Sequence, residues 1–167
     1  LPILSHMLFY MVIYSFMTIG AFGVLIALQD KYSIKSIEEW NGIGYVHPMI
    51  CALMVLNLLS LAGLPPTSGF VAKFYILASI IESKTFYWLA IVAIINTVIA
   101  LYYYFNIARS MFLETDFKKK YQSLDKIPVY IISITSIQGI IFYLYWAPLY
   151  NVIQRLLDRK STRLNSS

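Results

Sequence analysis

The chain has 167 residues, of which 59% are hydrophobic and only 13% carry a formal charge. Soluble domains contain about 45–50% and about 25% of such residues, so this composition excludes an ordinary soluble domain and indicates an integral membrane protein. The formal net charge of +5 does not support nucleic-acid binding, because much of the basic excess lies at the very end, in Arg159, Lys160 and Arg163. The single cysteine, Cys51, excludes a disulfide framework within the chain.

The two ends of the sequence differ from the apolar regions between them. The chain begins Leu1-Pro2-Ile3 without an initiator methionine, which favours the C-terminal part of a longer protein. The last nine residues, 159–167, form a polar run unlike those before it, which is typical of an appended foreign or disordered tail. We therefore expect residues 1–158 to be the C-terminal part of a membrane domain and residues 159–167 to lie outside it.

Four apolar regions are long enough to cross the membrane as helices, a passage that needs about 20 residues. They cover residues 3–28, 47–81, 85–108 and 127–154. The second region contains one charge and the interruption Gly-Leu-Pro-Pro-Thr-Ser-Gly at residues 63–69. The sequence therefore predicts an all-α bundle of four transmembrane spans, the second of them a broken helix.

The break in the second region depends on four residues: Gly63, Pro65, Pro66 and Gly69. Proline removes backbone donors and disfavours helix at the residue before it, while glycine permits other backbone angles. Backbone freed from hydrogen bonding at membrane depth is tolerated only where protein or a wet cavity satisfies it, and broken helices of this kind mark transport sites. We expect Thr67 or Ser68 to cap the second half-helix.

The connector charges predict how often this region crosses the membrane. Residues 29–46 carry two lysines and residues 112–126 carry four, and basic residues in short loops favour the cytoplasmic-type side. One net crossing places both connectors on that side, whereas two crossings place them on opposite sides. One net crossing is therefore favoured.

Lys73, four residues past Gly69, is the only formal charge between Glu39 and Glu82. A lysine near the bilayer centre costs about 2.5–3.5 kcal/mol on insertion scales, so a function is expected for it. Burial disfavours the charged amine, which predicts a group that binds and releases protons near physiological pH. The alternatives are a lysine that snorkels to the interface and one that pairs with a carboxylate outside this sequence.

The first span carries a polar stripe. His6, Tyr10 and Tyr14 recur every four residues and share one helix face, which is a candidate proton path through bound water or, alternatively, a packing surface. Packing roles are also expected for the following: Gly20, Gly23, Asn57, Ser60, Asn96 and Thr97 between helices, and Tyr143, Tyr145, Trp146 and Tyr150 at the membrane interface. The sequence has no haem-type histidine pair, iron–sulfur cysteine cluster, P-loop or dinucleotide motif, so no redox centre or metal is expected in this chain.

Residues 58–75, Leu-Leu-Ser-Leu-Ala-Gly-Leu-Pro-Pro-Thr-Ser-Gly-Phe-Val-Ala-Lys-Phe-Tyr, resemble the broken-helix motif of the antiporter-like subunits of respiratory complex I. Members of that family read close to Ser-Leu-Ala-Gly-(Ile/Leu)-Pro-Pro-x-x-Gly-Phe-x-x-Lys-Phe there. Tyr14, the run Gly20-Ala21-Phe22 and the run from Leu101 to Tyr104 are similar to the N subunit, the counterpart of mitochondrial subunit 2. The resemblance covers about residues 3–150.

The resemblance implies the last four of fourteen transmembrane helices, with the broken region as the twelfth. It places Lys73 in the family's C-terminal proton half-channel. The M subunit typically carries glutamate at this position and the L subunit an acidic residue after its lysine, so Lys73 followed by Phe74 favours the N subunit.

The function implied is proton translocation coupled to electron transfer from NADH to quinone. NAD, FMN, iron–sulfur clusters and quinone would reside on other subunits. The expected partners are neighbouring antiporter-like subunits and the lipid bilayer, in the bacterial inner membrane or, alternatively, the mitochondrial inner membrane. A subunit of an Mrp-type Na⁺/H⁺ antiporter and a structural membrane scaffold without an ion path remain the two alternatives.

Overall fold

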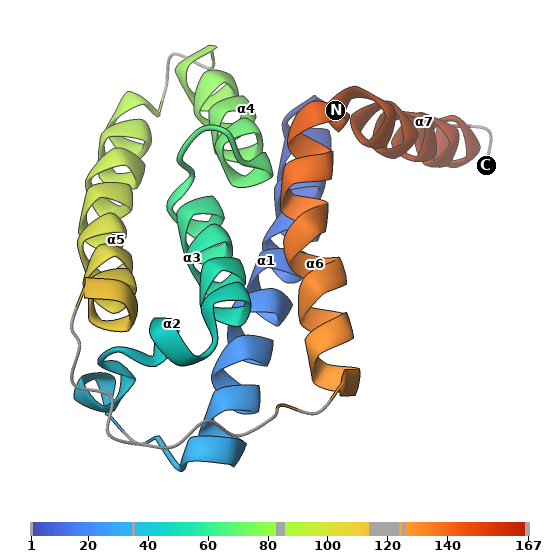
Figure 1. The fold of residues 1–167 in the computed structure, drawn as a ribbon. Coiled ribbons are helices and arrows are strands. Elements are labelled where there is room, and N and C mark those ends of the chain that lie inside the picture. Colours follow the sequence, from blue (N-terminus) through green and yellow to red (C-terminus); the bar gives the residue numbers. More distant parts are fainter. Residues whose placement is uncertain (1, 35, 83–85, 114–123, 125, 166–167) are drawn as a thin grey trace.

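The computed structural model describes residues 2–34, 36–82, 86–113, 124 and 126–165 (Figure 1). Throughout these ranges the regular elements are helices, which confirms the all-α prediction. In chain order they are α1 (Pro2–Tyr32), the 3-10 helix η1 (Ile37–Trp40), α2 (Ile43–Val46), α3 (Pro48–Ala62), α4 (Ser68–Glu82), α5 (Tyr87–Leu113), α6 (Lys126–Leu144) and α7 (Trp146–Asn165). Long uncharged runs become helices because a helix satisfies its own backbone hydrogen bonds away from water.

The main core lies where α1 packs against α3 and α6. Its buried side chains include Val24, Leu28, Met54 and Ile132. Two glycines of α1 bring the helices together, as predicted. A Cβ atom on Gly20 would lie 2.7 Å from the Asn57 amide nitrogen of α3, and one on Gly23 would lie 3.0 Å from Ile132 of α6.

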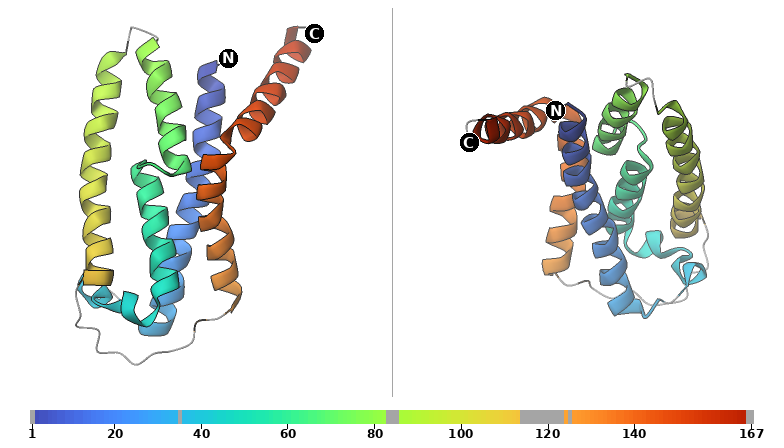
Figure 2. Two further views of the ribbon diagram at one scale, coloured as in Figure 1. Left: turned by 45° about the horizontal axis from the view of Figure 1, so that its top comes forward. Right: turned by 180° about the vertical axis from the view of Figure 1, so that it is seen from behind.

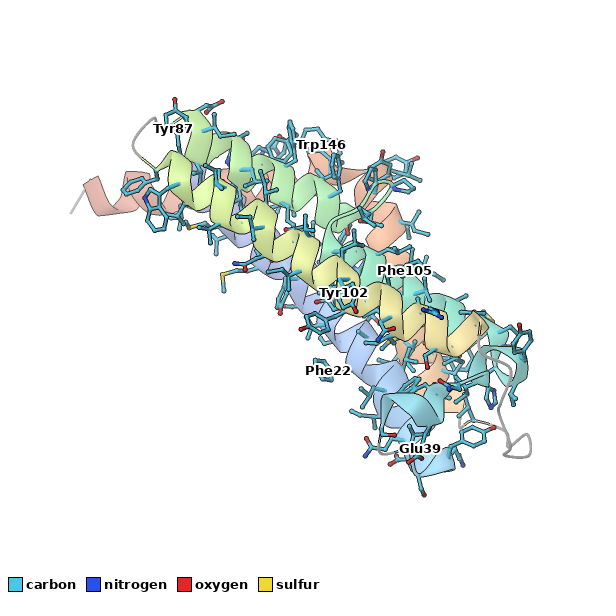
Figure 3. The ribbon with its side chains drawn as sticks, turned by 90° about the vertical axis from the view of Figure 1, so that its left-hand side faces the viewer. Phe22, Glu39, Tyr87, Tyr102, Phe105 and Trp146 are labelled. Carbon is cyan, nitrogen blue, oxygen red and sulfur yellow. The ribbon has the colours of Figure 1, made fainter. Side chains whose placement is uncertain are left out.

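Two of the described helices can each cross a membrane by length and composition, Leu4–Tyr32 in α1 and Tyr87–Phe112 in α5. α3 is a shorter apolar helix. Figure 3 shows the outer side of α5, where the side chains of Tyr102 and Phe105 point away from the bundle. These side chains are 72% and 65% exposed, as expected for a helix that faces lipid or further protein.

The fourth predicted span is not one continuous helix. α6 ends at Leu144 and α7 begins at Trp146 with a bend of 90°, so α7 projects away from the bundle (Figure 2). Pro148 explains the bend, because in a continuous helix its missing N–H would leave the Leu144 carbonyl unbonded and its ring would clash there. Proline is instead accommodated in the first turn of α7. Taken as one bent span, the pair brings the count from two to three.

α7 continues to Asn165, so the structure extends a helix over most of the run predicted to be a foreign or disordered tail. The foreign origin of residues 159–167 stays a prediction.

The connector between α1 and α3 lies at the same end of the bundle as the end of α5. The Gly42 N–H donates to the Ser110 carbonyl oxygen at 3.1 Å, and the Ser110 hydroxyl donates to the Asn41 side chain. Gly42 has a φ of 75°, a left-handed conformation that glycine adopts without strain. From this end α3 and α4 run in succession to the opposite end, and α5 returns (Figure 1).

Candidate functional site

α3 ends in a glycine-dependent hydrogen-bond pattern. Gly63 adopts a φ of 79°, its N–H donates to the Ser60 carbonyl oxygen at 3.0 Å, and the Leu64 N–H donates to the Leu59 carbonyl oxygen at 3.1 Å. This pair of bonds is a Schellman ending, for which a left-handed glycine is the usual residue. It satisfies two carbonyls but leaves those of Leu61 and Ala62, the last residues of the helix, to another donor.

α4 begins immediately beside α3, after a Pro65–Pro66 peptide bond that is cis. The expectation that Thr67 or Ser68 caps α4 is wrong. The Thr67 hydroxyl donates backwards to the Leu64 carbonyl oxygen at 2.7 Å, and the buried Ser68 hydroxyl has no partner within the described chain.

The cap of α4 comes from α3 instead. The Gly69 N–H donates to the Ser60 hydroxyl oxygen at 3.3 Å. The two half-helices approach so closely that a Cβ atom on Gly69 would lie 1.8 Å from the Ser60 carbonyl oxygen. Glycine is therefore required at residue 69 by contact rather than by backbone angle, and the helix start is satisfied across the break.

Lys73 reaches back over the break to the end of α3. Its Nζ donates to the carbonyl oxygens of Leu61 at 2.9 Å and Ala62 at 3.0 Å, and to the Thr97 hydroxyl oxygen of α5 at 3.4 Å. The side chain is half-buried, and it passes Gly63 so closely that a Cβ there would lie 2.7 Å from Lys73 Cδ. A helix C-terminus carries partial negative charge, so it is a favourable place for an ammonium group.

A cavity of about 350 Å³ opens beside the Lys73 side chain, between α1, α4 and α5. Its polar lining consists of Lys73, Tyr10, Tyr14, Asn96, Thr97 and Tyr104. Tyr10 and Tyr14 stack with ring centroids 5.8 Å apart. Water occupies about 30 Å³ per molecule in the liquid, so the cavity has both the room and the polar groups to hold several waters.

The structure separates His6 from the other two residues of the predicted stripe. His6 lines a second cavity of about 320 Å³ together with Ser79, whereas Tyr10 and Tyr14 line the cavity at Lys73. Ile76 of α4 borders both cavities. The stripe therefore passes along two neighbouring cavities separated by an apolar side chain.

His6 is held in a directional row of hydrogen bonds. The Ser79 hydroxyl donates to the Tyr75 carbonyl oxygen at 3.0 Å, so the contact of 2.6 Å between His6 Nδ1 and Ser79 Oγ requires the imidazole to donate. In a neutral ring Nε2 then accepts, and the Tyr150 hydroxyl donates to it at 2.8 Å. The Gln154 amide donates to that hydroxyl at 3.0 Å, which completes a row from α7 to α4.

The sequence predicts only packing roles for Asn57, Thr97 and Tyr150, and the structure gives their contacts. Asn57 does join helices, because its amide donates to the Ser136 hydroxyl of α6 at 2.7 Å. Thr97 also joins two helices, since its hydroxyl oxygen on α5 accepts from the Lys73 amine of α4, and Tyr150, expected at the membrane interface, bonds to His6. The signal for Thr97 was its place beside Asn96 in an otherwise apolar span, but which helix it faces is decided by packing.

In the parts of the chain that the structure describes, no three His, Cys, Asp or Glu side chains gather in a way that could hold a metal ion. The residues that line the Lys73 cavity also include no carboxylate. Within the described residues, the Lys73 ammonium is thus balanced by carbonyl and hydroxyl dipoles.

Comparison with known proteins gives one family and several relatives. A family model described as NADH:quinone oxidoreductase/Mrp antiporter, transmembrane, matches residues 3–100. The chain is 32% identical over 150 residues to NADH-quinone oxidoreductase subunit N 2 of Chloroherpeton thalassium, covering 85% of this chain and 28% of that protein. It is 38% identical over 111 residues to subunit N 2 of Rhizobium meliloti, covering 66% and 23% of the two chains.

A third relative, subunit N 2 of Solibacter usitatus, is 41% identical over 111 residues, which is 66% of this chain and 22% of that one. The resemblance to N subunits inferred from residues 58–75 is therefore confirmed. The chain spans roughly a quarter of the length of these curated relatives.

Proposed function

This chain belongs to the family of membrane subunits shared by NADH:quinone oxidoreductase and Mrp antiporters, and on this premise we propose that it is a proton-translocating subunit of complex I. In this proposal Lys73 is the group that accepts and releases the proton. Electron transfer from NADH to quinone takes place on other subunits, which hold NAD, FMN, iron–sulfur clusters and quinone. The relatives named as N subunits favour this assignment.

The observation that carries the proposal is the position of the Lys73 amine. It lies at the junction of two half-helices, bonded to the carbonyls of Leu61 and Ala62, and it borders a cavity able to hold water. A lysine inside a membrane is costly and marks an ion pathway by default. Here the amine makes its contacts within the bundle, with the last residues of α3 and with Thr97 of α5.

We propose that the chain crosses the membrane four times, with α3 and α4 together forming one broken span. Neither half is long enough to cross alone, since each has 15 residues and about 20 are needed. The hydrogen bond between Gly42 and Ser110 supports one net crossing, because it places the α1–α3 connector beside the end of α5. α6 provides the remaining span, and α7 turns away from it at a bend of 90° while its first turns pack on α1 through Tyr150 and Ile153.

The mechanism follows from electrostatics. Redox energy released elsewhere in the complex changes the charge of groups near Lys73, and each such change alters the free energy of its protonated form. The cavity with Tyr10 and Tyr14 supplies water contact on one side of the amine. The proposed partners are neighbouring antiporter-like subunits, in the bacterial inner membrane or the mitochondrial inner membrane.

The test is substitution of Lys73 in the whole complex. Lys73→Ala should abolish or strongly impair proton pumping while assembly and subunit content persist, and normal pumping by that variant would refute the role. Lys73→Arg should also impair pumping, because a guanidinium remains protonated. Lys73→Met distinguishes proton transfer by Lys73 from the scaffold alternative. A structural subunit without an ion path would keep coupled turnover with this neutral side chain of similar length, whereas a proton-translocating subunit would lose it.

The family description also includes Mrp antiporters, so sodium transport is the second candidate function. It is separated by measuring whether transport by the assembled protein depends on sodium ions. Transport that proceeds equally in sodium-free buffer assigns the proton as the ion.

A further inference from the structure

We propose that Thr97 is a positioning residue that holds the Lys73 side chain docked on the end of α3 while its amine is protonated, and that the side chain leaves this dock when the proton is lost. The inference rests on the proposed function of Lys73. It adds a second position for the amine and names the residue on α5 that makes the first position selective for charge.

The dock consists entirely of hydrogen-bond acceptors. Two are the carbonyl oxygens of Leu61 and Ala62. The third is the Thr97 hydroxyl oxygen, whose only hydrogen is already donated to the Ala93 carbonyl oxygen at 2.9 Å. Thr97 can therefore only accept from the lysine.

An ammonium group matches this dock and a neutral amine does not. Lysine in its charged form has three donors and no acceptor, which pairs one hydrogen with each of the three oxygens. A neutral amine has two hydrogens and a lone pair. Docked, its lone pair would face an oxygen with no hydrogen to offer, and one acceptor would lose its bond.

The ending of α3 keeps the dock available. The Gly63 and Leu64 N–H groups bond to the Ser60 and Leu59 carbonyls and leave the carbonyls of the last two residues free to meet the lysine. The same end of the helix carries the negative part of its dipole, which favours a cation and does nothing for a neutral amine.

The cavity provides hydrogen-bond donors for the neutral amine, which the dock does not. The residues that line it include Tyr10, Tyr14, Tyr104 and Asn96, whose side chains carry hydroxyl or amide groups that can donate a hydrogen bond. The flexible lysine side chain lines this cavity already, so rotation of its own bonds is enough to move the amine. Loss of the proton thus shifts the amine from the carbonyls of α3 toward the water-accessible cavity.

Among the described residues, the other titratable side chains that line the Lys73 cavity are Tyr10 and Tyr14 on α1 and Tyr104 on α5. His6 on α1 lines the neighbouring cavity, on the other side of Ile76. From α3 the amine meets only backbone carbonyls. Because Thr97 bonds to the amine itself, a change of the pH profile on altering Thr97 reports on Lys73.

The experiment measures proton pumping by the assembled complex across a range of pH. Thr97→Val keeps the side-chain shape but removes the third acceptor, which weakens the protonated dock. The alkaline limb of the pumping profile should move to lower pH by about half a unit to one unit, while Thr97→Ser, which retains the hydroxyl, should keep the original profile. Thr135→Val is the matched control, because the Thr135 hydroxyl bonds only to carbonyls of its own helix.

A Thr97→Val profile that superimposes on that of the unmodified complex would overturn the inference, and so would an equal shift in Thr135→Val. If Thr97→Val does not assemble, Thr97→Cys makes the same test, since a thiol is only a weak acceptor. Lys73→Ala measured in the same series keeps the two proposals apart. Normal pumping by Lys73→Ala rejects the proposed function, whereas impaired pumping with no shift in Thr97→Val rejects only the dock.

Discussion

The Nζ atom of Lys73 on α4 lies 3.0 Å from the carbonyl oxygen of Ala62, the last residue of α3. Two helices separated by a proline-containing break are therefore joined by a charge on one and the backbone of the other. The contact ties the protonation of the lysine to the relative position of the two half-helices, because a displacement of α4 away from α3 removes acceptors from the amine.

Replacing Gly63 tests how far the lysine depends on the helix ending. Gly63→Ala should destabilise the complex by about 1–2 kcal/mol, because alanine disfavours the φ of 79° found here. The new methyl would also meet the Lys73 side chain, 2.7 Å from its Cδ, and displace the amine. Proton pumping should therefore fall even at temperatures where the complex stays folded. Both are measured on the purified complex, as the midpoint of thermal inactivation and as proton pumping per quinone reduced. Unchanged pumping would show that proton transfer does not depend on the close passage of the Lys73 side chain over Gly63.

Gly69→Ala tests the close approach of the two half-helices. An added Cβ would lie 1.8 Å from the Ser60 carbonyl oxygen, so α4 must move away from α3 and the complex should assemble in smaller amounts. Gly139→Ala on α6 is the matched control, because its Cβ would make only ordinary contacts of 3.8 Å with the Ser60 and Ser68 hydroxyls. Subunit content of purified membranes measures the effect. Equal assembly of the two variants would contradict the packing described here.

The contact between Asn57 and Ser136 should stabilise the bundle without taking part in transport. Interhelical hydrogen bonds in membranes are worth about 0.6 kcal/mol on average. Asn57→Ala and Ser136→Ala should each lower the thermal midpoint slightly, and the double variant should lower it by less than the sum of the two. Pumping per quinone reduced should remain normal in all three. A loss of pumping in Asn57→Ala would give this residue a role beyond packing.

A proton-carrying role for His6 and a packing role predict different results when His6 is replaced. His6→Phe keeps a ring beside those of Tyr75 and Tyr150, whose centroids lie 5.1 and 5.3 Å from that of His6, but it removes every hydrogen bond of the imidazole. If His6 carries protons, pumping should fall in His6→Phe and fall as well in Tyr150→Phe, which removes the donor to Nε2. Pumping at the normal rate in both variants, with only lower thermal midpoints, would leave the row a packing feature.

Much of the fold follows from the sequence because membranes restrict the choices. Uncharged runs of about 20 residues must be helical, and the Gly63 to Gly69 segment has to interrupt a helix. The bend between α6 and α7 was missed although Pro148 signals it, because the aromatic residues around it extend the apolar run past Leu144. Hydropathy alone does not distinguish a helix that continues from one that turns.

The sequence predicts only part of the candidate site. Lys73 is evident as a lone charge, but its dock consists of backbone carbonyls, which every residue has. Thr97 faces the lysine because of how α5 packs on α4, and a single sequence does not encode that rotation visibly. His6 and Tyr14 share a helix face, yet eight residues place them about 12 Å apart along it, enough to reach separate cavities.

The row from Gln154 to Tyr75 is polarised, because each of its hydrogens points toward α4. A proton that entered at Tyr150 and left from Ser79 would reverse the bonds between them, since each group passes on its own hydrogen and keeps its neighbour's. The imidazole would end in its other tautomer. A second proton could follow only after the hydroxyls and the imidazole ring had rotated back. The rate of repeated transfer would therefore be limited by these rotations and not by the proton transfer itself.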